Sequence, residues 1–176
     1  MSTAVPPLLQ VRRDGPALVA TLQRAPVNAI NAELLDELDA VLDLAEADDG
    51  ISVLHLRSAL KVFCAGADLA LIRESTATPQ GRNRMVAIVQ DMQRVFARLE
   101  NAPCVTLAEL GGACVGGGFE MALACDWRIA ANEALMRLRH RKALIELANR
   151  HRLPSATCTS PSAWAWPPWY HKPTSR

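Results

Sequence analysis

Hydrophobic and polar residues alternate with two different periods along the first part of the chain. Residues 8–15 and 17–24 are aliphatic segments on either side of "DGP", which predicts a β-hairpin with Asp14 and Gly15 at the turn. Residues 28–50 have apolar side chains at helical spacing, with Asn31 as a candidate N-cap and Gly50 just past the end. The apolar stripe of this helix consists of Leu34, Leu35, Leu38, Val41 and Leu42.

The pattern continues as strands and helices up to residue 131. The predicted elements are a strand at 51–58, a loop leading into a short helix at 59–74, a helix at 82–100, a strand at 104–110, a glycine-rich turn at 111–118, a helix at 119–125 and a strand at 126–131. The strand at 51–58 is so apolar that we expect it to be covered on both faces. The helix at 82–100 has its stripe at Met85, Ile88, Val89, Met92, Val95 and Leu99.

This order of elements predicts a mixed α/β fold without strict βαβ alternation. A dinucleotide-binding fold is disfavoured because "GACVGGG" lacks the G-x-G-x-x-G spacing. A P-loop is disfavoured as well, because Gly118 is followed by Phe119 and Glu120 rather than by Lys and a hydroxyl residue. Neither nucleotide-binding class fits the sequence.

Charge and glycine content divide the chain near residue 134. Residues 1–134 hold 11 Lys and Arg against 17 Asp and Glu, whereas residues 135–176 hold 8 against 1. All nine glycines lie at or before Gly118. We therefore treat 1–134 as the folded core and 135–176 as a separate basic tail, rich in Pro and Trp.

The remaining composition sets the expected surroundings. No segment has the roughly 20 consecutive apolar residues that cross a bilayer, and the first residues do not form a secretory leader, so we expect a cytoplasmic protein without membrane contact. The five cysteines have irregular spacing, which favours buried reduced thiols over disulfides or a metal site. The sequence therefore gives no reason to assign a metal.

Two glycine-bearing turns are the candidate chemistry of the core. "FCAGAD" at 63–68 and "CVGGGF" at 114–119 each stand where a strand leads into a helix. The first N–H groups of a helix have no partner inside it, and glycine lets another group approach the backbone closely. Such turns often serve only for chain reversal or packing. Two of them, followed by Asp68 and Glu120, favour an oxyanion hole built from two backbone N–H groups.

The segments "PVNAINAELLDEL", "FCAGADL" and "GGACVGGGFEMALACDWRIAA" closely resemble the enoyl-CoA hydratase/isomerase, or crotonase, family over residues 8–134. The resemblance implies an α/β spiral of ββα units, here truncated and followed by a tail that does not match. It also implies binding of acyl-CoA thioesters, with coenzyme A as part of the substrate and no separate cofactor.

By position in these motifs, the resemblance assigns the two N–H donors to Ala67 and Gly117. It assigns to Glu120 the role of the first of two glutamates that hydratases of the family use on the added water. The residues it implies as lining the CoA and acyl groups are Val27, Asn28, Ala29, Ala65, Gly66, Asp68 and Leu69. The resemblance further implies trimers or dimers of trimers, through C-terminal helices that this sequence lacks.

The sequence departs from the family where the second glutamate is expected. That position holds His140, within "LMRLRHRKALIEL", and the glycines and helices that follow in the family are missing. We interpret residues from about 135 onward as the product of a frameshift, which resequencing of the gene tests. Other interpretations are a basic helix at 135–149 that binds RNA or an anionic membrane, and a ligand-stacking role for "WAWPPWY". We expect no nucleic-acid partner.

The sequence therefore favours a hydratase of 2-enoyl-CoA that is weak or inactive, because only one of its two acids is present. One alternative is a crotonase reaction that needs a single acid, such as enoyl-CoA isomerisation. The other is a non-catalytic acyl-CoA binder, or a partner of an intact paralogue.

Overall fold

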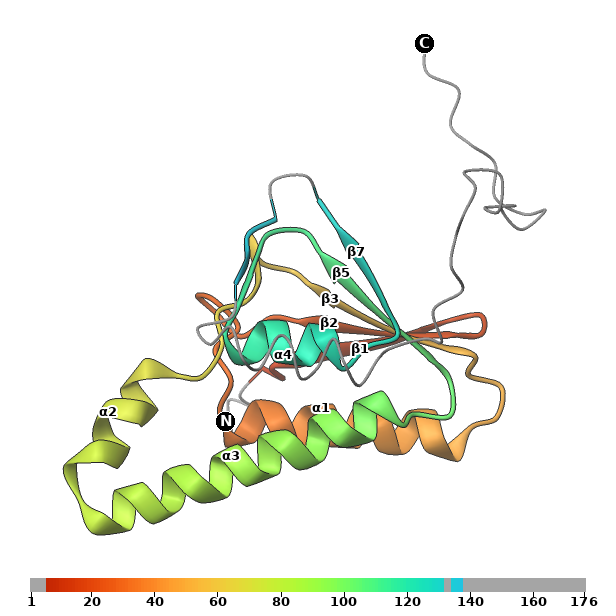
Figure 1. Cartoon of the computed structure of the whole chain (residues 1–176). Helices are drawn as coiled ribbons and strands as arrows, with labels where there is room; N and C mark the ends of the chain where they lie inside the picture. The colour runs from red at the N-terminus through yellow and green to blue at the C-terminus, as the bar shows by residue number, and fades with distance from the viewer. Residues whose placement is uncertain (1–5, 132–133, 138–176) are drawn as a thin grey trace, which may run out of the picture. The chain divides into compact units, whose positions relative to one another are not determined.

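The computed structural model describes residues 6–131 and 134–137, except for the side chains of residues 74–77 and 137. These residues form a series of ββα units, as Figure 1 shows. The strands are β1 (Leu9–Asp14), β2 (Ala17–Leu22), β3 (Val53–Ser58), β4 (Val62–Cys64), β5 (Val105–Leu110), β6 (Ala113–Val115), β7 (Trp127–Ala130) and β8 (Met136–Arg137). The helices are α1 (Ala32–Ala47), α2 (Leu69–Ala77), α3 (Pro79–Glu100) and α4 (Gly117–Leu123).

The strands of the described ranges form two sheets. The larger sheet has the order β1-β2-β3-β5-β7, in which β1 and β2 are antiparallel and the other neighbours are parallel. The smaller sheet is parallel and has the order β4-β6-β8. From β3 onward, the first strand of each unit joins the larger sheet and the second joins the smaller one. The predicted α/β spiral of ββα units is thereby confirmed.

The predicted hairpin is confirmed, with its turn displaced by one residue. Asp14 pairs with Ala17, so the two residues between the strands are Gly15 and Pro16 rather than Asp14 and Gly15. Gly15 has φ of 57°, in the left-handed region that glycine adopts without steric cost. Glycine therefore occupies the first turn position, and Asp14 ends the preceding strand.

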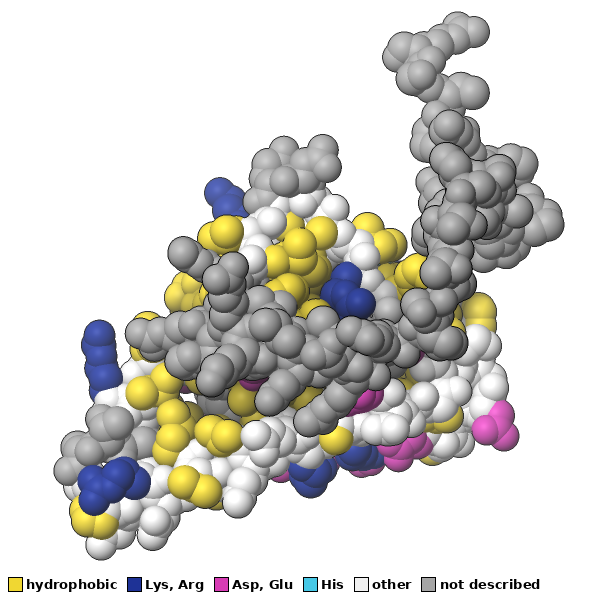
Figure 2. All heavy atoms as spheres, viewed as in Figure 1, with side chains coloured by type: hydrophobic (Ala, Val, Ile, Leu, Met, Phe, Trp, Pro, Cys, Tyr) yellow, Lys and Arg dark blue, Asp and Glu magenta, His cyan; other side chains and the backbone are white. Residues whose placement is uncertain are grey.

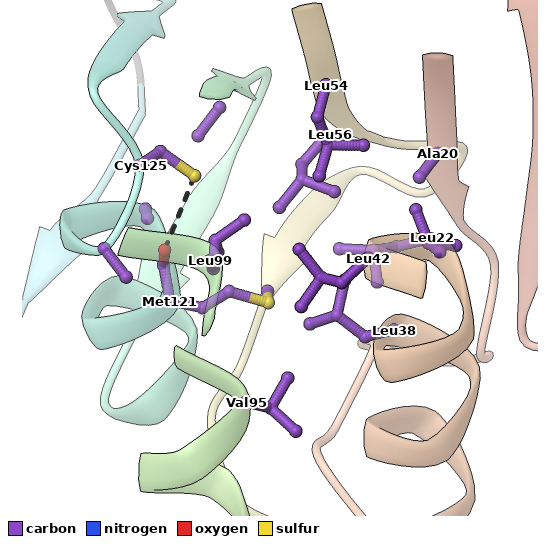
Figure 3. Packing of buried hydrophobic residues seen from close by; sticks show 14 of the residues in the cluster. Ala20, Leu22, Leu38, Leu42, Leu54, Leu56, Val95, Leu99, Met121 and Cys125 are labelled. Carbon is purple, nitrogen blue, oxygen red and sulfur yellow. Dashed lines mark hydrogen bonds between the residues drawn. The ribbon is translucent and has the colours of Figure 1, made fainter. Parts of the chain in front are cut away.

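Helices α1 and α3 run along one face of the larger sheet (Figure 1). Asn31 is the N-cap of α1, as predicted, and its Oδ1 accepts a hydrogen bond from Leu34 N at 3.1 Å. All five residues of the predicted α1 stripe are buried. Figure 3 shows Met121 of α4 pointing toward Leu38 and Leu42 of α1. Burial of one such side chain contributes about 1.5–3 kcal/mol, so α4 is anchored to the same core as α1.

Ion pairs join α1 and α3 on their solvent side. Arg94 and Arg98 of α3 contact carboxylates of α1, and Figure 2 shows cationic and anionic side chains close together along this edge. Asp39 accepts hydrogen bonds from both arginines. Arg98 also pairs with Asp43 at 2.7 Å and with Glu46 at 2.9 Å. These contacts fix the rotation of α3 against α1.

The expectation that the strand at 51–58 is covered on both faces is wrong. Strand β3 is well covered on one face only: Leu54 and Leu56 are buried, whereas His55 is partly exposed and Arg57 is exposed. Of the α3 stripe, only Val95 and Leu99 near the C-terminal end are buried, together with the neighbouring Phe96. The remaining stripe residues are partly or largely exposed, because the first half of α3 extends with α2 beyond the sheet (Figure 1).

Several predictions concern the region after residue 131. Strand β8 occupies Met136–Arg137 and pairs with β6, so a helix beginning at 135 is wrong at its start. His140 and "WAWPPWY" lie outside the described residues. Within the described ranges, no helix combines the length and apolar character needed to cross a membrane. The expected cytoplasmic location stays a prediction.

Candidate active site

Three segments that are distant in sequence meet at the candidate site. Segment 27–30 runs beside segment 65–68: Ala65 N donates to Val27 O at 3.0 Å, Ile30 N to Gly66 O at 2.8 Å, and Asp68 N to Ile30 O at 3.0 Å. The third segment, 115–117, lies against Gly66. These contacts bring the predicted lining residues and both glycine turns together.

The glycine turns are adjacent because the strands before them are paired. Strands β4 and β6 are parallel neighbours, with Cys64 opposite Cys114. Each strand is followed by a turn and then a helix, so both turns leave the smaller sheet at the same edge. A Cβ placed on Gly66 would lie 3.0 Å from Val115 O and 3.1 Å from Gly117 N. Only a glycine permits this approach, and its φ of 85° also favours glycine.

The N–H of Ala67 points away from segment 27–30. In a trans peptide, the carbonyl and the following N–H point in opposite directions. Because Gly66 O accepts a hydrogen bond from Ile30 N, the N–H of Ala67 is directed to the other side, where the third segment lies. No described residue accepts a hydrogen bond from this N–H.

The N–H of Gly117 is directed out of the start of α4. The carbonyl of Gly116 accepts hydrogen bonds from Phe119 N at 2.9 Å and from Glu120 N at 3.1 Å, so it points into the helix. The following N–H therefore points out of the helix, where it has no acceptor in the described ranges. A Cβ placed on Gly117 would lie 3.9 Å from Ala67 N, so the two donors flank the same small space.

The three consecutive glycines have three different functions. Gly116 has φ of 55° and supplies the backbone reversal between β6 and α4. Gly117 supplies the N–H donor. Gly118 packs against β4, because a Cβ at this position would lie 2.5 Å from Cys64 O and 2.7 Å from Cys64 Sγ. The triple glycine thus combines a turn, a backbone N–H without an acceptor in the described ranges and a packing contact, in sequence order.

Glu120 lies in the first turn of α4 and is half-buried. It follows Gly117 by three residues, which places both on the same side of the helix, about 4.5 Å apart along its axis. Its carboxylate forms no ion pair or hydrogen bond with a residue of the described ranges. A carboxylate is a group that can accept or donate a proton near neutral pH when its surroundings raise its pKa.

Apolar side chains stand beside the donors, and a cleft lined by neither donor residue nor Glu120 opens next to Asp68. Ile30 Cδ1 and Met92 Sδ would each lie 3.2 Å from a Cβ on Gly117, so they close the space beside it. The cleft has a volume of about 240 Å³, and Asp68 is the neighbour of Ala67 in the chain. The residues lining the cleft are Asn31, Ala32, Glu33, Asp68, Ala70, Leu71, Arg84 and Ile88.

The predicted lining residues differ in exposure. Asn28 is completely buried, and its Nδ2 donates to Ser58 Oγ at 2.8 Å and to Phe63 O at 2.9 Å. Its side chain therefore stabilises the backbone of segment 27–30 by buried hydrogen bonds and does not face a ligand. Its φ of 51° lies in the left-handed region. Val27 and Ala29 are half-buried, whereas Ala65 and Leu69 are exposed.

Arg24 is a residue of this site that the sequence did not indicate. Its Nη1 donates to Ala29 O at 2.9 Å, and its Nη2 contacts Asp68 Oδ2 at 2.7 Å. Asp68 caps α2 by accepting from Ala70 N at 2.9 Å. The hydrogen bond from Arg24 is the main cause that lowers the pKa of Asp68 below its ordinary value. No spacing rule predicts this contact, because its partners lie 44 residues apart.

The expectation of buried free thiols is confirmed for the four cysteines of the described ranges. Cys64, Cys104, Cys114 and Cys125 are buried and unpaired. Burial raises the pKa of Cys64 to about 11 and that of Cys114 to about 12. These thiols are therefore packing residues rather than nucleophiles. The described residues contain no group of three or more side chains placed to hold a metal ion.

The fold is that of solved crotonase-type structures. The structure of DspI from Pseudomonas aeruginosa matches with a TM-score of 0.68 and 28% identity, over 78% of this chain and 56% of that chain. An enoyl-CoA hydratase/isomerase family protein from Silicibacter pomeroyi matches with a TM-score of 0.68 and 27% identity, over 77% of this chain and 57% of that chain.

Sequence similarity indicates the same family. The enoyl-CoA hydratase/isomerase family model matches residues 14–143. A probable enoyl-CoA hydratase of Bacillus subtilis is 35% identical over 120 residues, which is 68% of this chain and 45% of that protein. The mitochondrial methylglutaconyl-CoA hydratase of Mus musculus is 35% identical over 122 residues, which is 67% of this chain and 36% of that protein. The chain belongs to the enoyl-CoA hydratase/isomerase family, and it spans less than half the length of these two relatives.

Proposed function

We propose that this chain binds acyl-CoA thioesters and polarises their carbonyl group with the N–H groups of Ala67 and Gly117. The observation that carries this proposal is the pair of N–H groups, without acceptors in the described ranges, on two adjoining turns. Two donors of this kind stabilise an oxygen that becomes negative in the transition state, and loss of one such donor costs about 100- to 1000-fold in rate. Membership of the family supports the thioester as the ligand class.

The proposed reaction is the addition of water across the Cα=Cβ bond of a 2-enoyl-CoA. Polarisation of the carbonyl makes Cβ electrophilic, so the water oxygen bonds to Cβ while Glu120 accepts a proton from that water. The electron pair of the double bond moves to the thioester enolate, and Cα then takes the proton that Glu120 accepted from the water, so that the elements of one water molecule are added in total. Hydratases of the family divide these proton transfers between two glutamates, so we expect this chain to hydrate slowly or not at all.

An isomerase reaction is the second candidate, because it requires only one carboxylate. Glu120 would remove a proton from one carbon of a 3-enoyl-CoA and return it to another, which moves the double bond without net loss of a proton. Asp68 is the other carboxylate near the donors, but its oxygens already accept hydrogen bonds from Arg24 and Ala70 N. It is therefore a poor second acid, which favours a reaction that needs Glu120 alone. A non-catalytic acyl-CoA binder, or a partner of an intact paralogue, is the third candidate.

The decisive experiment separates binding from turnover. Calorimetry with crotonyl-CoA measures binding, the loss of enoyl absorbance measures hydration, and 3-hexenoyl-CoA tests isomerisation. Binding that Glu120→Gln leaves unchanged, together with turnover that this variant abolishes, supports an enzyme. Binding without turnover of either substrate supports a non-catalytic role. Absence of binding to any CoA thioester contradicts the proposal.

A further inference from the structure

Arg24 joins two segments of the candidate site through one guanidinium group. Its Nη1 donates to the carbonyl of Ala29, and its Nη2 pairs with the carboxylate of Asp68. The side chains of Arg24 and Asp68 are 22% and 21% exposed, so water screens this ion pair less than those at the surface. A planar guanidinium holds both partners in a fixed geometry, which a single ammonium group does not.

The residues that Arg24 fastens flank the peptide that carries the first donor. Ala29 precedes Ile30, whose N–H holds the carbonyl of Gly66 at 2.8 Å. On the other side, Asp68 N donates to Ile30 O at 3.0 Å. The peptide between Gly66 and Ala67 therefore lies inside a closed ring of hydrogen bonds. Arg24 lies outside both segments, and its side chain adds one hydrogen bond to each of them, at Ala29 O and at Asp68 Oδ2.

We propose that Arg24 is a positioning residue for this site: by bridging Ala29 O and Asp68, it fixes the direction of the Ala67 N–H. The inference rests on the proposed function, because the N–H needs a fixed direction only if it binds an oxygen. An oxyanion donor is effective when it is already oriented before the charge develops, and small misplacements are costly. Arg24 supplies this orientation without contacting the ligand.

The test compares Arg24→Met with Arg13→Met as a matched control. Arg13 has the same chemistry, because it pairs with Asp48 and donates to Gly15 O and Gly50 O. It lies by the C-terminal end of α1, whose 16 residues place it about 24 Å from the site end of that helix. The two variants therefore remove the same kinds of interaction, an ion pair and hydrogen bonds to carbonyls, from different places, and the Arg13 pair is the more exposed of the two.

The first measurement is amide hydrogen exchange without ligand. We expect Arg24→Met to raise the exchange rates of the Ile30 and Asp68 amides at least tenfold, and Arg13→Met to leave them unchanged. Equal rates at both amides in Arg24→Met and wild type would overturn the inference. This measurement involves no thioester, so it is independent of the proposed function.

The second measurement is the carbonyl stretching frequency of bound crotonyl-CoA labelled with ¹³C at the thioester carbon. We expect Arg24→Met to keep its Kd within about threefold of wild type but to lose at least half of the downward shift that binding produces. An unchanged shift would overturn the inference. Absence of a shift in the wild type itself contradicts the proposed function, while the exchange result stands.

Two further variants keep the test decisive if Arg24→Met fails to fold. Asp68→Asn retains an N-cap for α2 and loses the ionic partner of Arg24, so we expect the same loss of carbonyl shift. Arg24→Lys retains the charge and loses the bridging geometry, so we expect intermediate exchange rates. Wild-type exchange rates and a wild-type carbonyl shift in both variants would overturn the inference.

Discussion

Gly66 and Gly117 are in direct backbone contact: a Cβ placed on Gly66 would lie 3.1 Å from the amide nitrogen of Gly117. Neither residue could carry a side chain without filling the space between the two turns. The contact depends on the pairing of β4 with β6, which fixes where the two turns start. Two short strands therefore determine the geometry of the candidate site.

Gly117→Ala tests the space between the donors. The added methyl group would meet only the flexible ends of Ile30 and Met92, each at 3.2 Å, so we expect the variant to fold. It would also lie 3.9 Å from Ala67 N, where the ligand oxygen is proposed to bind. We expect at least tenfold weaker binding of crotonyl-CoA by calorimetry. Gly111→Ala, where no atom lies within 4 Å of an added Cβ, is the control and should bind normally.

Gly118→Ala should instead affect stability. Its methyl group would lie 2.5 Å from the backbone oxygen of Cys64, which cannot move without displacing β4. Forcing extra volume into a packed site costs about 1–3 kcal/mol. Urea unfolding should show a lower midpoint for Gly118→Ala than for Gly111→Ala. Equal midpoints would mean that α4 does not pack against β4 as described.

The ion pairs between α1 and α3 predict a loss of stability in acid. The hydrogen bond from Arg94 is the largest cause that lowers the pKa of Asp39, and Arg98 acts in the same direction. A carboxyl group whose pKa is lower in the folded state stabilises the fold above its unfolded pKa of about 3.9. That contribution is lost as the pH falls through the folded pKa.

We expect the contribution of Asp39 to be about 1 kcal/mol, because its side chain is 24% exposed and shared by two arginines. Urea unfolding at pH 7 and at a series of pH values below 4 measures it. Asp39→Asn should be less stable than wild type at pH 7, and the difference should shrink toward acid pH. A difference that does not change with pH would contradict the assignment.

The buried thiols should resist alkylation in the folded protein. With its pKa raised to about 11, Cys64 carries a thiolate fraction of about 0.001 at pH 8, and the thiolate is the reactive form. We expect peptide mass spectrometry after brief iodoacetamide treatment to show Cys64, Cys114 and Cys125 unmodified. The same peptides should be fully modified in urea. Rapid modification of the native protein would contradict the burial of these residues.

The larger elements followed from the sequence because their signals are periodic and local. The apolar stripe of α1 extends over several helical turns and begins at the Asn31 cap, so the local pattern alone predicts this helix. Helices α3 and α4 begin earlier than predicted, at Pro79 and Gly117. For α3 the start is fixed by Thr78, whose side chain accepts a hydrogen bond from Gly81 N. Strands β4 and β6 have three residues each, which is too short for a periodic signal.

The site was predictable only in part. The glycine turns indicate where backbone N–H groups are exposed, and the family motifs assign Ala67 and Gly117. Arg24 could not be found in this way, because its contacts with Ala29 O and Asp68 exist only after segments 27–30 and 65–68 meet. The one-sided burial of β3 was also missed, because the pattern of a strand does not reveal which neighbours cover it.

The order of the larger sheet has a consequence for synthesis on the ribosome. From β2 onward, β3, β5 and β7 are each added beside the preceding strand of that sheet, and none is inserted between earlier neighbours. Each strand therefore finds its partner already made when it leaves the exit tunnel. The two glycine turns and Glu120 all lie within the first 120 residues, so they are synthesised before β7. The two glycine turns and Glu120 can thus be brought together vectorially, by strands that have all been made before β7.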